Sequence, residues 1–505
     1  MANVAANLMR RMLHRSFGPL VRRRRHGDLR RARFDADLVR RARDTWWGDD
    51  ARWFPGGTPP RRRNRVTPLV DGAAYLADLR QALCEAQHYV YIAGWFCTPE
   101  MPLDQSSVEA MDETSLLRVL GEVARRVPVR VLLWNGANFL FRPTKSMTEK
   151  VCGTITQQGG DIRCLLDGTA HLTHCHHQKA IVIDGRVAFV GGIDLTTLQG
   201  DRWDTPCHPL RVGPNWHDVQ LRLEGEVVAD VEANFRQRWA AVAGAGAAEL
   251  PHRDPIPDPG WDTPAQIVRT IPRRTYPFAP DGEYGIYHAY VRALRSAERL
   301  IYLENQYLWC PEIMDALIAA MNRRRDGPFR IAIVLPARAY DGKWDNDRHV
   351  ARLREVDGGR GIVSVYSPYT SGPGSDAAAF IYRPIYVHAK VAIVDDAWLT
   401  VGSANLNNRG LATDSEINAV VRDAGLARGL REQLWAEHLG CSREEVASAD
   451  PHELLDHLWP ARAEENAAIM RRADRPLPSA VLRYEVGRMP GAWLLEEAQA
   501  LTVER

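Results

Sequence analysis

The chain contains the stretch HQKAIVID at His177–Asp184 and a second copy of its pattern, HAKVAIVD, at His388–Asp395. Both copies follow the rule His-x-Lys-x-x-x-x-Asp. Lysine is rare in this protein, because the chain has five lysines while the other 60 basic residues are arginines. At such frequencies one match is expected in roughly one chain in a hundred. Two matches therefore indicate a built functional site and not two ordinary amphipathic strands.

The surroundings of the two copies are also repeated. A glycine-led turn follows each copy, VGGID in the first and VGSAN in the second, and the offset of 211 residues equals that of the histidines. Upstream, residues 89–92 match residues 300–303 at the same offset, and residues 130–133 match residues 330–333 at an offset of 200. A repeat of this length is typical of a duplicated domain half and not of a short-period solenoid.

Each unit is predicted to have the order βαβα followed by a hairpin. Short runs rich in β-branched residues predict strands, and longer runs with apolar residues at helical spacing predict helices. The helices are predicted at 75–87, 115–126, 287–299 and 311–324. Alternating helices and strands predict an α/β fold with a mixed sheet in each half.

The parity of a strand places the signature side chains. Residues two apart share a face, so the histidine and the lysine of each copy project together. The aspartates, Asp184 and Asp395, have the opposite parity and lie where each strand turns, and Asp184-Gly185 is a hairpin signal. We therefore expect the aspartates to orient the site or to hold a turn.

Two imidazoles and two ammonium groups at one point suit phosphoryl transfer. Lysine is a compact cation for phosphoryl oxygens, and this chemistry consists mostly of positioning and charge stabilisation. One histidine can attack phosphorus while the other protonates the leaving oxygen, and the roles then reverse. The lysines supply the positive charge, so we expect no metal and no other cofactor.

The paired signature resembles the phospholipase D superfamily, and its flanks resemble the eukaryotic-type phospholipases D. The similar flanks are GGIDL at 191–195, RWDTP with a following histidine at 202–208, WHD at 216–218, NFRQRW at 234–239, IYLENQY at 301–307 and GSANLNNR at 402–409. The resemblance covers about residues 70 to 440. It implies two tandem α/β/α lobes that form one bilobal catalytic unit. It also implies hydrolysis of phosphatidylcholine-like lipids to phosphatidate, with transfer to alcohols.

The resemblance implies a role for each signature residue. The catalytic set is His177, Lys179, Asp184, His388, Lys390 and Asp395. His177 would be the nucleophile and His388 the general acid and then the base, although the residues alone leave the order of the two histidines open. The phosphate would be bound by Lys179, Lys390, Ser403 and Asn405.

Two acids that follow the motifs, Asp218 and Glu416, would hold the histidine rings and fix their tautomers. The alternative for this pair is a structural ion pair. The halves are not equivalent, because the first repeat has Gly192 and Asp194 where the second has the predicted phosphate-binding serine and asparagine.

The same residues also allow other functions. The run with His171, His174, Cys175, His176 and His177 could hold zinc. The second copy has only its own histidine there, so the shared chemistry does not require that site. The alternatives to lipid hydrolysis are a phosphatidyltransferase such as a cardiolipin synthase-like enzyme and a nuclease-type phosphodiesterase. Nucleases of the superfamily commonly carry one motif per chain and dimerise.

Charge and composition indicate where the protein acts. Residues 1–70 contain 18 arginines and six aspartates, a net charge of +12, so the rest of the chain carries −10. Apolar residues in the first 17 positions fall at helical spacing, which favours contact with an anionic membrane surface. The alternatives are an arm packed along the acidic body and an organelle transit peptide. The eight cysteines are scattered, which favours a reducing compartment.

We therefore expect a cytoplasmic, peripherally membrane-associated monomer that acts on phospholipid and not on nucleic acid. No run of about 18 apolar residues is present to span a bilayer. Eight prolines between residues 251 and 280 predict a linker between the halves. The predicted division is a basic arm at 1–66, a first repeat at 67–248, a linker at 249–282, a second repeat at 283–440 and a helical extension at 441–505.

Overall fold

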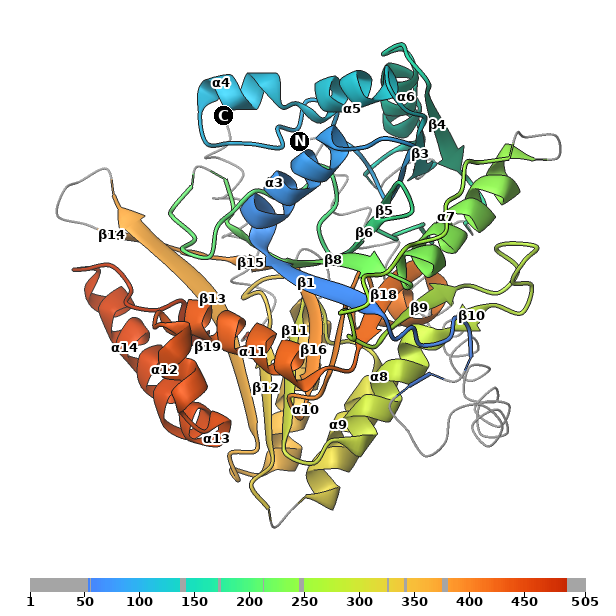
Figure 1. The fold of residues 1–505 in the computed structure, drawn as a ribbon. Helices are drawn as coiled ribbons and strands as arrows, with labels where there is room; N and C mark the ends of the chain where they lie inside the picture. The colour runs from blue at the N-terminus through green and yellow to red at the C-terminus, as the bar shows by residue number, and fades with distance from the viewer. Residues whose placement is uncertain are drawn as a thin grey trace, which may run out of the picture.

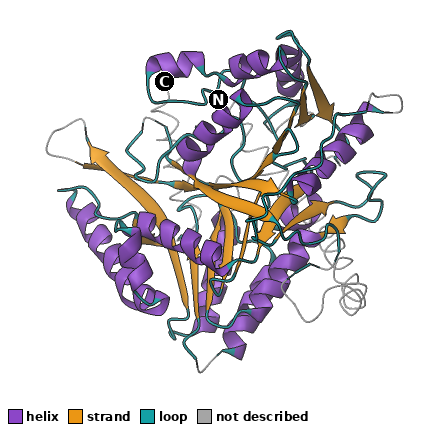
Figure 2. Cartoon of the chain, viewed as in Figure 1, coloured by secondary structure: helices purple, strands orange, loops and turns teal. Residues whose placement is uncertain are grey.

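The computed structural model describes residues 53–487, apart from 55, 137–141, 171–173, 212, 245–248, 325–326, 340–342 and 375–379. Most of the predicted basic arm therefore lies outside the described residues. Figure 1 shows helices at the outer ends of the molecule and strands between them, and Figure 2 shows the same layers by type of element.

The first half is built on a seven-stranded sheet with the order β1-β8-β6-β5-β2-β3-β4. Strands β2, β3 and β4 are parallel neighbours, and the remaining neighbours are antiparallel. The sheet is therefore mixed, as predicted. The strands are β1 (Asn64–Val70), β2 (Val90–Gly94), β3 (Val129–Trp134), β4 (Ile162–Asp167), β5 (Ala180–Ile183), β6 (Val187–Gly191) and β8 (Val219–Gly225).

The second half repeats this topology. Its central order is β9-β18-β17-β16-β11-β12-β13, so each strand has a counterpart in the first sheet, and β10, β14 and β19 are additions. The structure thus confirms the duplication. The strands are β9 (Ala265–Ile271), β10 (Glu283–Tyr284), β11 (Leu300–Asn305), β12 (Arg330–Val334), β13 (Val363–Pro373), β14 (Phe380–Pro384), β16 (Lys390–Val394), β17 (Trp398–Gly402), β18 (Glu416–Val421) and β19 (Val481–Arg483).

Helices pack on both faces of the two sheets, and α7 and α11 lie on the inner side. The four that the periodicity predicts are α3, α5, α8 and α9, with ends shifted by a few residues. Helix α5 illustrates the cause, because its apolar side chains recur at helical spacing and are buried against the sheet. The helices are α3 (Asp71–Cys84), α4 (Val108–Glu113), α5 (Leu116–Ala124), α6 (Lys145–Thr156), α7 (Val228–Ala243), α8 (Gly285–Ser296), α9 (Pro311–Arg323), α10 (Lys343–Asp357), α11 (Ala424–Leu439), α12 (Arg443–Ser448), α13 (Pro451–Glu453) and α14 (Trp459–Arg472).

The inner faces of the two sheets share one hydrophobic core with α7 and α11. Separate cores lie under the outer helices of each half. Both sheets therefore contribute to one packed interior, which holds the halves in a defined relation. This arrangement brings the ends of equivalent strands from the two halves to one place.

Strand β9 lies inside the segment that its prolines predict to be a linker. It occupies the sheet position that β1 occupies in the first half, and all seven of its residues are buried. The prolines at 264 and 272 flank the strand without interrupting it. Strand β1 likewise begins at Asn64, before the predicted start of the first repeat. The division into domains remains a prediction.

After α11 the chain forms α12, α13 and α14 and then adds β19 to the second sheet through β13. None of the described helices is long and apolar enough to cross a membrane.

Candidate active site

His388 is anchored to the opposite half of the molecule. Strand β7 (Trp216–His217) of the first half pairs in parallel with β15 (Tyr386–Val387) of the second. The backbone N–H of His388 continues this ladder and donates to the carbonyl of His217 at 2.8 Å. The short ladder therefore fixes the backbone from which the imidazole projects.

His177 is anchored in the equivalent way. A parallel bridge joins His176 to Ser415, and the backbone N–H of His177 donates to the Ser415 carbonyl at 2.9 Å. In both halves, the residue that receives this bond directly precedes one of the two predicted acids. The two histidines are thus related by the internal repeat and meet where the halves join.

Each imidazole is held at Nδ1 by an acid from the opposite half. His177 Nδ1 lies 2.9 Å from Glu416 Oε1, and His388 Nδ1 lies 2.6 Å from Asp218 Oδ2. A carboxylate accepts hydrogen, so the Nδ1 atoms carry it in this arrangement and the Nε2 atoms remain for chemistry. The sequence predicted both acids as ring-holding groups, but it did not assign either acid to a particular histidine.

Each signature lysine turns its ammonium group back toward its own histidine. Lys179 Nζ donates to the His177 carbonyl at 3.1 Å and lies 3.5 Å from Asp194 Oδ2. Lys390 Nζ donates to the carbonyl of His388. Both lysine side chains are buried. Two cations therefore lie beside the imidazoles, as the resemblance implies for phosphate binding.

Burial dominates the titration of these groups. It lowers the pKa of both His177 and His388 well below the ordinary value, and the nearby lysines lower it further. It also lowers the pKa of Lys390 to about 7. Burial raises the pKa of Asp218 to about 6 and that of Glu416 well above its ordinary value. The imidazoles are thus neutral at pH 7. A bound anion would favour the charged forms of the imidazoles and of Lys390, which burial disfavours.

The two additional phosphate-binding candidates differ in their contacts. The hydroxyl of Ser403 donates to the Glu416 carboxylate, so a bond to phosphate would require an exchange of partner. Asn405 is buried, and its Oδ1 has no hydrogen-bond partner among the described residues. Gly192 occupies the serine position in the first half, where a Cβ would lie 2.0 Å from Asp218 Oδ1. The difference between the repeats therefore has a steric reason.

The structure corrects the inclusion of Asp184 and Asp395 in the catalytic set. Both lie at the far end of their strands in turns with positive φ, 57° and 54°. Asp184 accepts three backbone N–H groups at 2.7–2.9 Å, from Gln87, His88 and Tyr89. Asp395 accepts the equivalent three at 2.8–3.1 Å, from Glu298, Arg299 and Leu300. These bonds match the turn-holding role that strand parity predicted.

Among the described residues, which do not include 171–173, the histidine-cysteine run does not form a group of potential metal ligands. His176 Nε2 lies 2.9 Å from Asp167 Oδ1, and its Nδ1 contacts the Ser415 hydroxyl. Arg409 Nη2 donates to Cys175 Sγ at 3.5 Å. These side chains therefore support the segment that carries His177.

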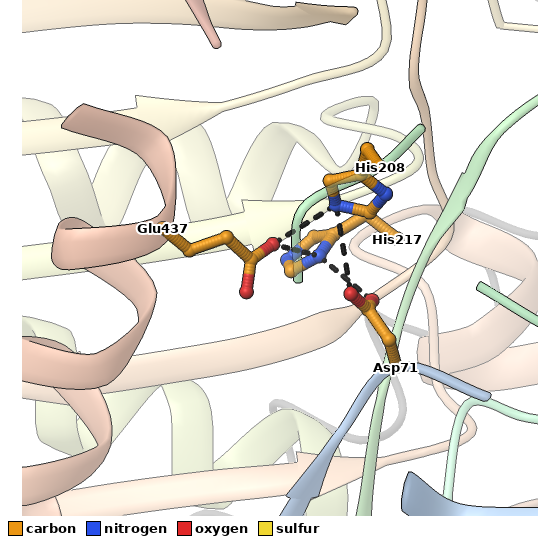
Figure 3. A group of neighbouring side chains, drawn as sticks. All are labelled: Asp71, His208, His217 and Glu437. Atoms are coloured by element: carbon orange, nitrogen blue, oxygen red, sulfur yellow. Dashed lines mark hydrogen bonds and ion pairs between the residues drawn. The ribbon is translucent and has the colours of Figure 1, made fainter. Parts of the chain in front are cut away.

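A buried cluster that the sequence analysis missed adjoins this site, because His217 directly precedes Asp218. Figure 3 shows its side chains. Its members are Asp71, His208, His217 and Glu437. His217 Nδ1 lies 3.0 Å from Asp71 and 2.9 Å from Glu437, and His208 Nε2 lies 3.0 Å from Glu437. The two histidines belong to the first half and Glu437 to α11 of the second. The sequence signal for this cluster is limited to the segments 202–208 and 216–218, which contain the two histidines and resemble the phospholipase D family.

Two overlapping groups of side chains in this region are close enough to hold a metal ion, because the donor atoms within each group lie within 4.8 Å of one another. One group is the cluster of Figure 3, and the other consists of His217, Glu304 and His438. The same contacts also form an ion-pair network. Burial opposes the charged form of His208, but the carboxylates outweigh it and raise its pKa to about 10. A divalent cation would have to displace these protons, because metal-bound imidazole is neutral.

Comparison with known proteins places both halves of the chain in one superfamily. The family model described as phospholipase D matches residues 82–213, and the one described as cardiolipin synthase, PLD-like domain, matches residues 290–437. Phospholipase D alpha 1 of Brassica oleracea var. capitata is 25% identical, over 83% of this chain and 71% of its own length. Phospholipase D A of Dictyostelium discoideum is 26% identical, over 76% of this chain and 36% of its own length.

Among solved structures, the phosphatidylserine synthase of Haemophilus influenzae Rd KW20 matches with a TM-score of 0.47 and 13% identity, over 87% of this chain and 93% of its own. The two family models each match the half that contains one copy of the signature. The chain belongs to the phospholipase D superfamily. At the level of the superfamily, its activity is that of a phosphodiesterase.

Proposed function

We propose that this protein hydrolyses glycerophospholipids such as phosphatidylcholine to phosphatidate and the headgroup alcohol. The reaction proceeds through a phosphohistidine, and an alcohol can take the place of water. One observation carries the proposal: two histidines from the two repeats meet with both Nδ1 atoms bound to acids, beside two buried lysines.

In the first step, Nε2 of His177 forms a bond to phosphorus, and the bond between phosphorus and the headgroup oxygen breaks. The bound phosphodiester anion favours the imidazolium form of His388, which carries hydrogen on both nitrogens. His388 then gives its Nε2 proton to that oxygen, so the alcohol leaves neutral. The lysines balance the charge on the phosphoryl oxygens. Glu416 stabilises the positive charge that develops on His177, because it accepts the Nδ1 hydrogen.

In the second step, His388 takes a proton from water while the water oxygen attacks phosphorus. The bond from phosphorus to His177 breaks and phosphatidate is released. An alcohol in place of water gives a phosphatidyl ester of that alcohol. Hydrolysis and transfer therefore share one intermediate.

The relatives named phospholipase D support a lipid substrate. The arginine-rich segment before residue 66 supports contact with an anionic membrane surface. We propose that the protein acts there as a peripheral cytoplasmic monomer and does not act on nucleic acid.

A phosphatidyltransferase is the second candidate, because the family model that matches residues 290–437 is described as cardiolipin synthase, PLD-like domain. The same site would serve, with the hydroxyl of a second lipid as the acceptor. The two candidates differ only in which acceptor reaches the phosphohistidine.

One experiment tests the proposal and separates the candidates. Vesicles of phosphatidylcholine, phosphatidylethanolamine or phosphatidylglycerol are incubated with the protein, with and without ethanol, and the lipids are analysed by mass spectrometry. We expect phosphatidate from phosphatidylcholine, and phosphatidylethanol when ethanol is present. Cardiolipin from phosphatidylglycerol as the main product would favour the transferase. No turnover of any lipid would contradict both.

A further inference from the structure

The two halves of the active site differ at one position that the internal repeat makes equivalent. Trp216 and Asp414 each lie two residues before the acid that holds the histidine of the opposite half. Trp216 pairs with Tyr386 in the short ladder. Asp414 contacts Cys175, which like Tyr386 lies two residues before a signature histidine. The Asp414 carboxylate accepts the Cys175 N–H at 3.0 Å. One position therefore carries an indole on the His388 side and a carboxylate on the His177 side.

On the His388 side, Trp216 contacts both the imidazole and an arginine. The ring centroids of Trp216 and His388 are 5.0 Å apart, and the guanidinium carbon of Arg202 lies 3.9 Å from the indole centroid on a neighbouring loop. Trp216 and Arg202 are almost fully buried. Arg202 also donates to the Leu198 carbonyl at 2.8 Å and to that of Gly200. The imidazole thus contacts a tilted indole, and the arginine that contacts the same indole is fixed at the backbone.

On the His177 side, an arginine from a different position of the repeat binds the carboxylate. Arg409 Nε donates to Asp414 Oδ2 at 2.6 Å, and its Nη2 donates to Asp414 Oδ1 at 3.1 Å. The equivalent positions 216 and 414 therefore each contact an arginine, but one presents a π-system to it and the other an anion.

This difference makes the two imidazoles chemically unequal. Burial and the lysines lower the pKa of His177, while Asp414 raises it. Burial and Lys390 lower the pKa of His388, and Arg202 lowers it as well. An imidazole beside an anion is the better nucleophile, and an imidazolium beside a cation is the stronger proton donor.

We infer that Trp216 and Arg202 are positioning residues that dedicate His388 to protonation of the leaving alcohol. The indole holds the imidazole by ring contact, and the arginine holds the indole by a cation–π contact. This inference rests on the proposed function, because it deepens the role of one histidine in that reaction.

The test compares two leaving groups on the same phosphatidyl moiety. Choline is an alkyl alcohol and needs a proton to leave, whereas p-nitrophenol leaves readily as an anion. The variants are Trp216→Leu, Arg202→Met, and the conservative pair Trp216→Phe and Arg202→Lys. Thermal unfolding shows whether each variant folds, and Arg202→Met carries the test if the tryptophan variant does not.

We expect Trp216→Leu and Arg202→Met to lose about tenfold more kcat on phosphatidylcholine than on phosphatidyl-p-nitrophenol. Trp216→Phe and Arg202→Lys should recover part of the difference, because a ring and a charge remain. Asp414→Asn should slow both substrates alike, since it acts on the attacking side. Arg118→Met, on an exposed helical arginine, is the matched control and should leave both rates unchanged.

Equal losses on the two substrates would overturn this inference and leave the proposed function standing, because a merely structural role would affect both leaving groups alike. An unmodified protein that turns over neither substrate would overturn the proposed function and the inference with it.

Discussion

Burial and one hydrogen bond each set the orientation and the protonation state of His177 and His388. The bond to the acid fixes the ring and the tautomer, and burial keeps the ring neutral at pH 7. Both histidines act on one phosphorus in the proposed mechanism, so they should behave as one unit in mutagenesis.

His177→Ala and His388→Ala should therefore each lower kcat by about a thousandfold or more, and the double variant should lose little beyond that. Steady-state turnover of a short-chain phosphatidylcholine measures this effect. Lys150→Ala, on an exposed helical face, is a control. A single variant with a tenth of the original rate would contradict the one-site mechanism.

Lys390 gives the pH dependence a defined sign. Its ammonium group is charged below its pKa of about 7 and neutral above it, so its contribution to phosphate binding is lost as the pH rises through 7. His177 is already unprotonated there. We expect kcat/KM for a soluble diester to decline above about pH 7, since this parameter reports the free enzyme.

Lys390→Arg should move that decline to higher pH, because a guanidinium stays charged, although the maximal rate should fall. The measurement is kcat/KM between about pH 5 and 9. A profile that is flat above pH 7 in the unmodified protein, or an unshifted decline in the variant, would argue against this role for Lys390.

Among the elements, the two strands that carry the signature are the most predictable from sequence. Their apolar runs, their period of two and the turn after each were all readable. The strands begin later than the signature does, at Ala180 and Lys390, so His177, Lys179 and His388 lie just before them. Strand β9 was not predicted, because the surrounding prolines suggested a linker. A single strand flanked by prolines also carries no local signal of its sheet partner. Only the pairing of β9 with β18 completes the second sheet.

Asp184 stabilises the packing of two elements, since its hydrogen bonds join the end of β5 to the loop before β2. Asp184→Ala would leave three buried or half-buried N–H groups unpaired, so we expect a loss of about 1–3 kcal/mol in the free energy of unfolding. Urea denaturation measures it. Asp184→Asn should cost less, because asparagine tolerates positive φ and keeps one acceptor.

The specific activity of the folded Asp184→Ala fraction should stay close to normal, in contrast to the histidine variants. A loss of activity as large as that of His177→Ala, with unchanged stability, would return the aspartate to the catalytic set.

For the whole molecule, the cluster of Figure 3 raises the question of a metal ion. The lysines already supply charge at phosphorus, so a chelator such as EDTA should leave hydrolysis of a soluble diester largely intact. The matching measurement is thermal unfolding with and without EDTA. Activity that is lost with EDTA and restored by one divalent cation would show that the chemistry depends on bound metal, and His208→Ala would then test whether this cluster holds it.

The basic arm is expected to bring the enzyme to its substrate. Basic residues contribute on the order of 1 kcal/mol each near an anionic surface, weakened by salt. Deleting residues 1–40, which lie outside the described residues, should therefore weaken binding to phosphatidylserine-containing vesicles, most at low salt. Turnover of a monomeric short-chain lipid should hardly change. Undiminished vesicle binding would favour an arm that packs along the acidic body.

The sequence by itself determined that two equivalent units exist and that each carries a histidine and a lysine next to an apolar strand. These features follow from repetition and from the local residue pattern. The resemblance to the phospholipase D superfamily implied that the two acids hold the rings.

Only the tertiary structure decided which acid serves which histidine. Each acid crosses to the opposite half, because the short ladders at β7 with β15 and at His176 with Ser415 bring the end of one repeat against the start of the other. The same crossing assembles the buried cluster from Asp71, His217 and Glu437, which are far apart along the chain. Contacts of this kind depend on how two sheets pack, and no periodicity within a single strand or helix records that packing.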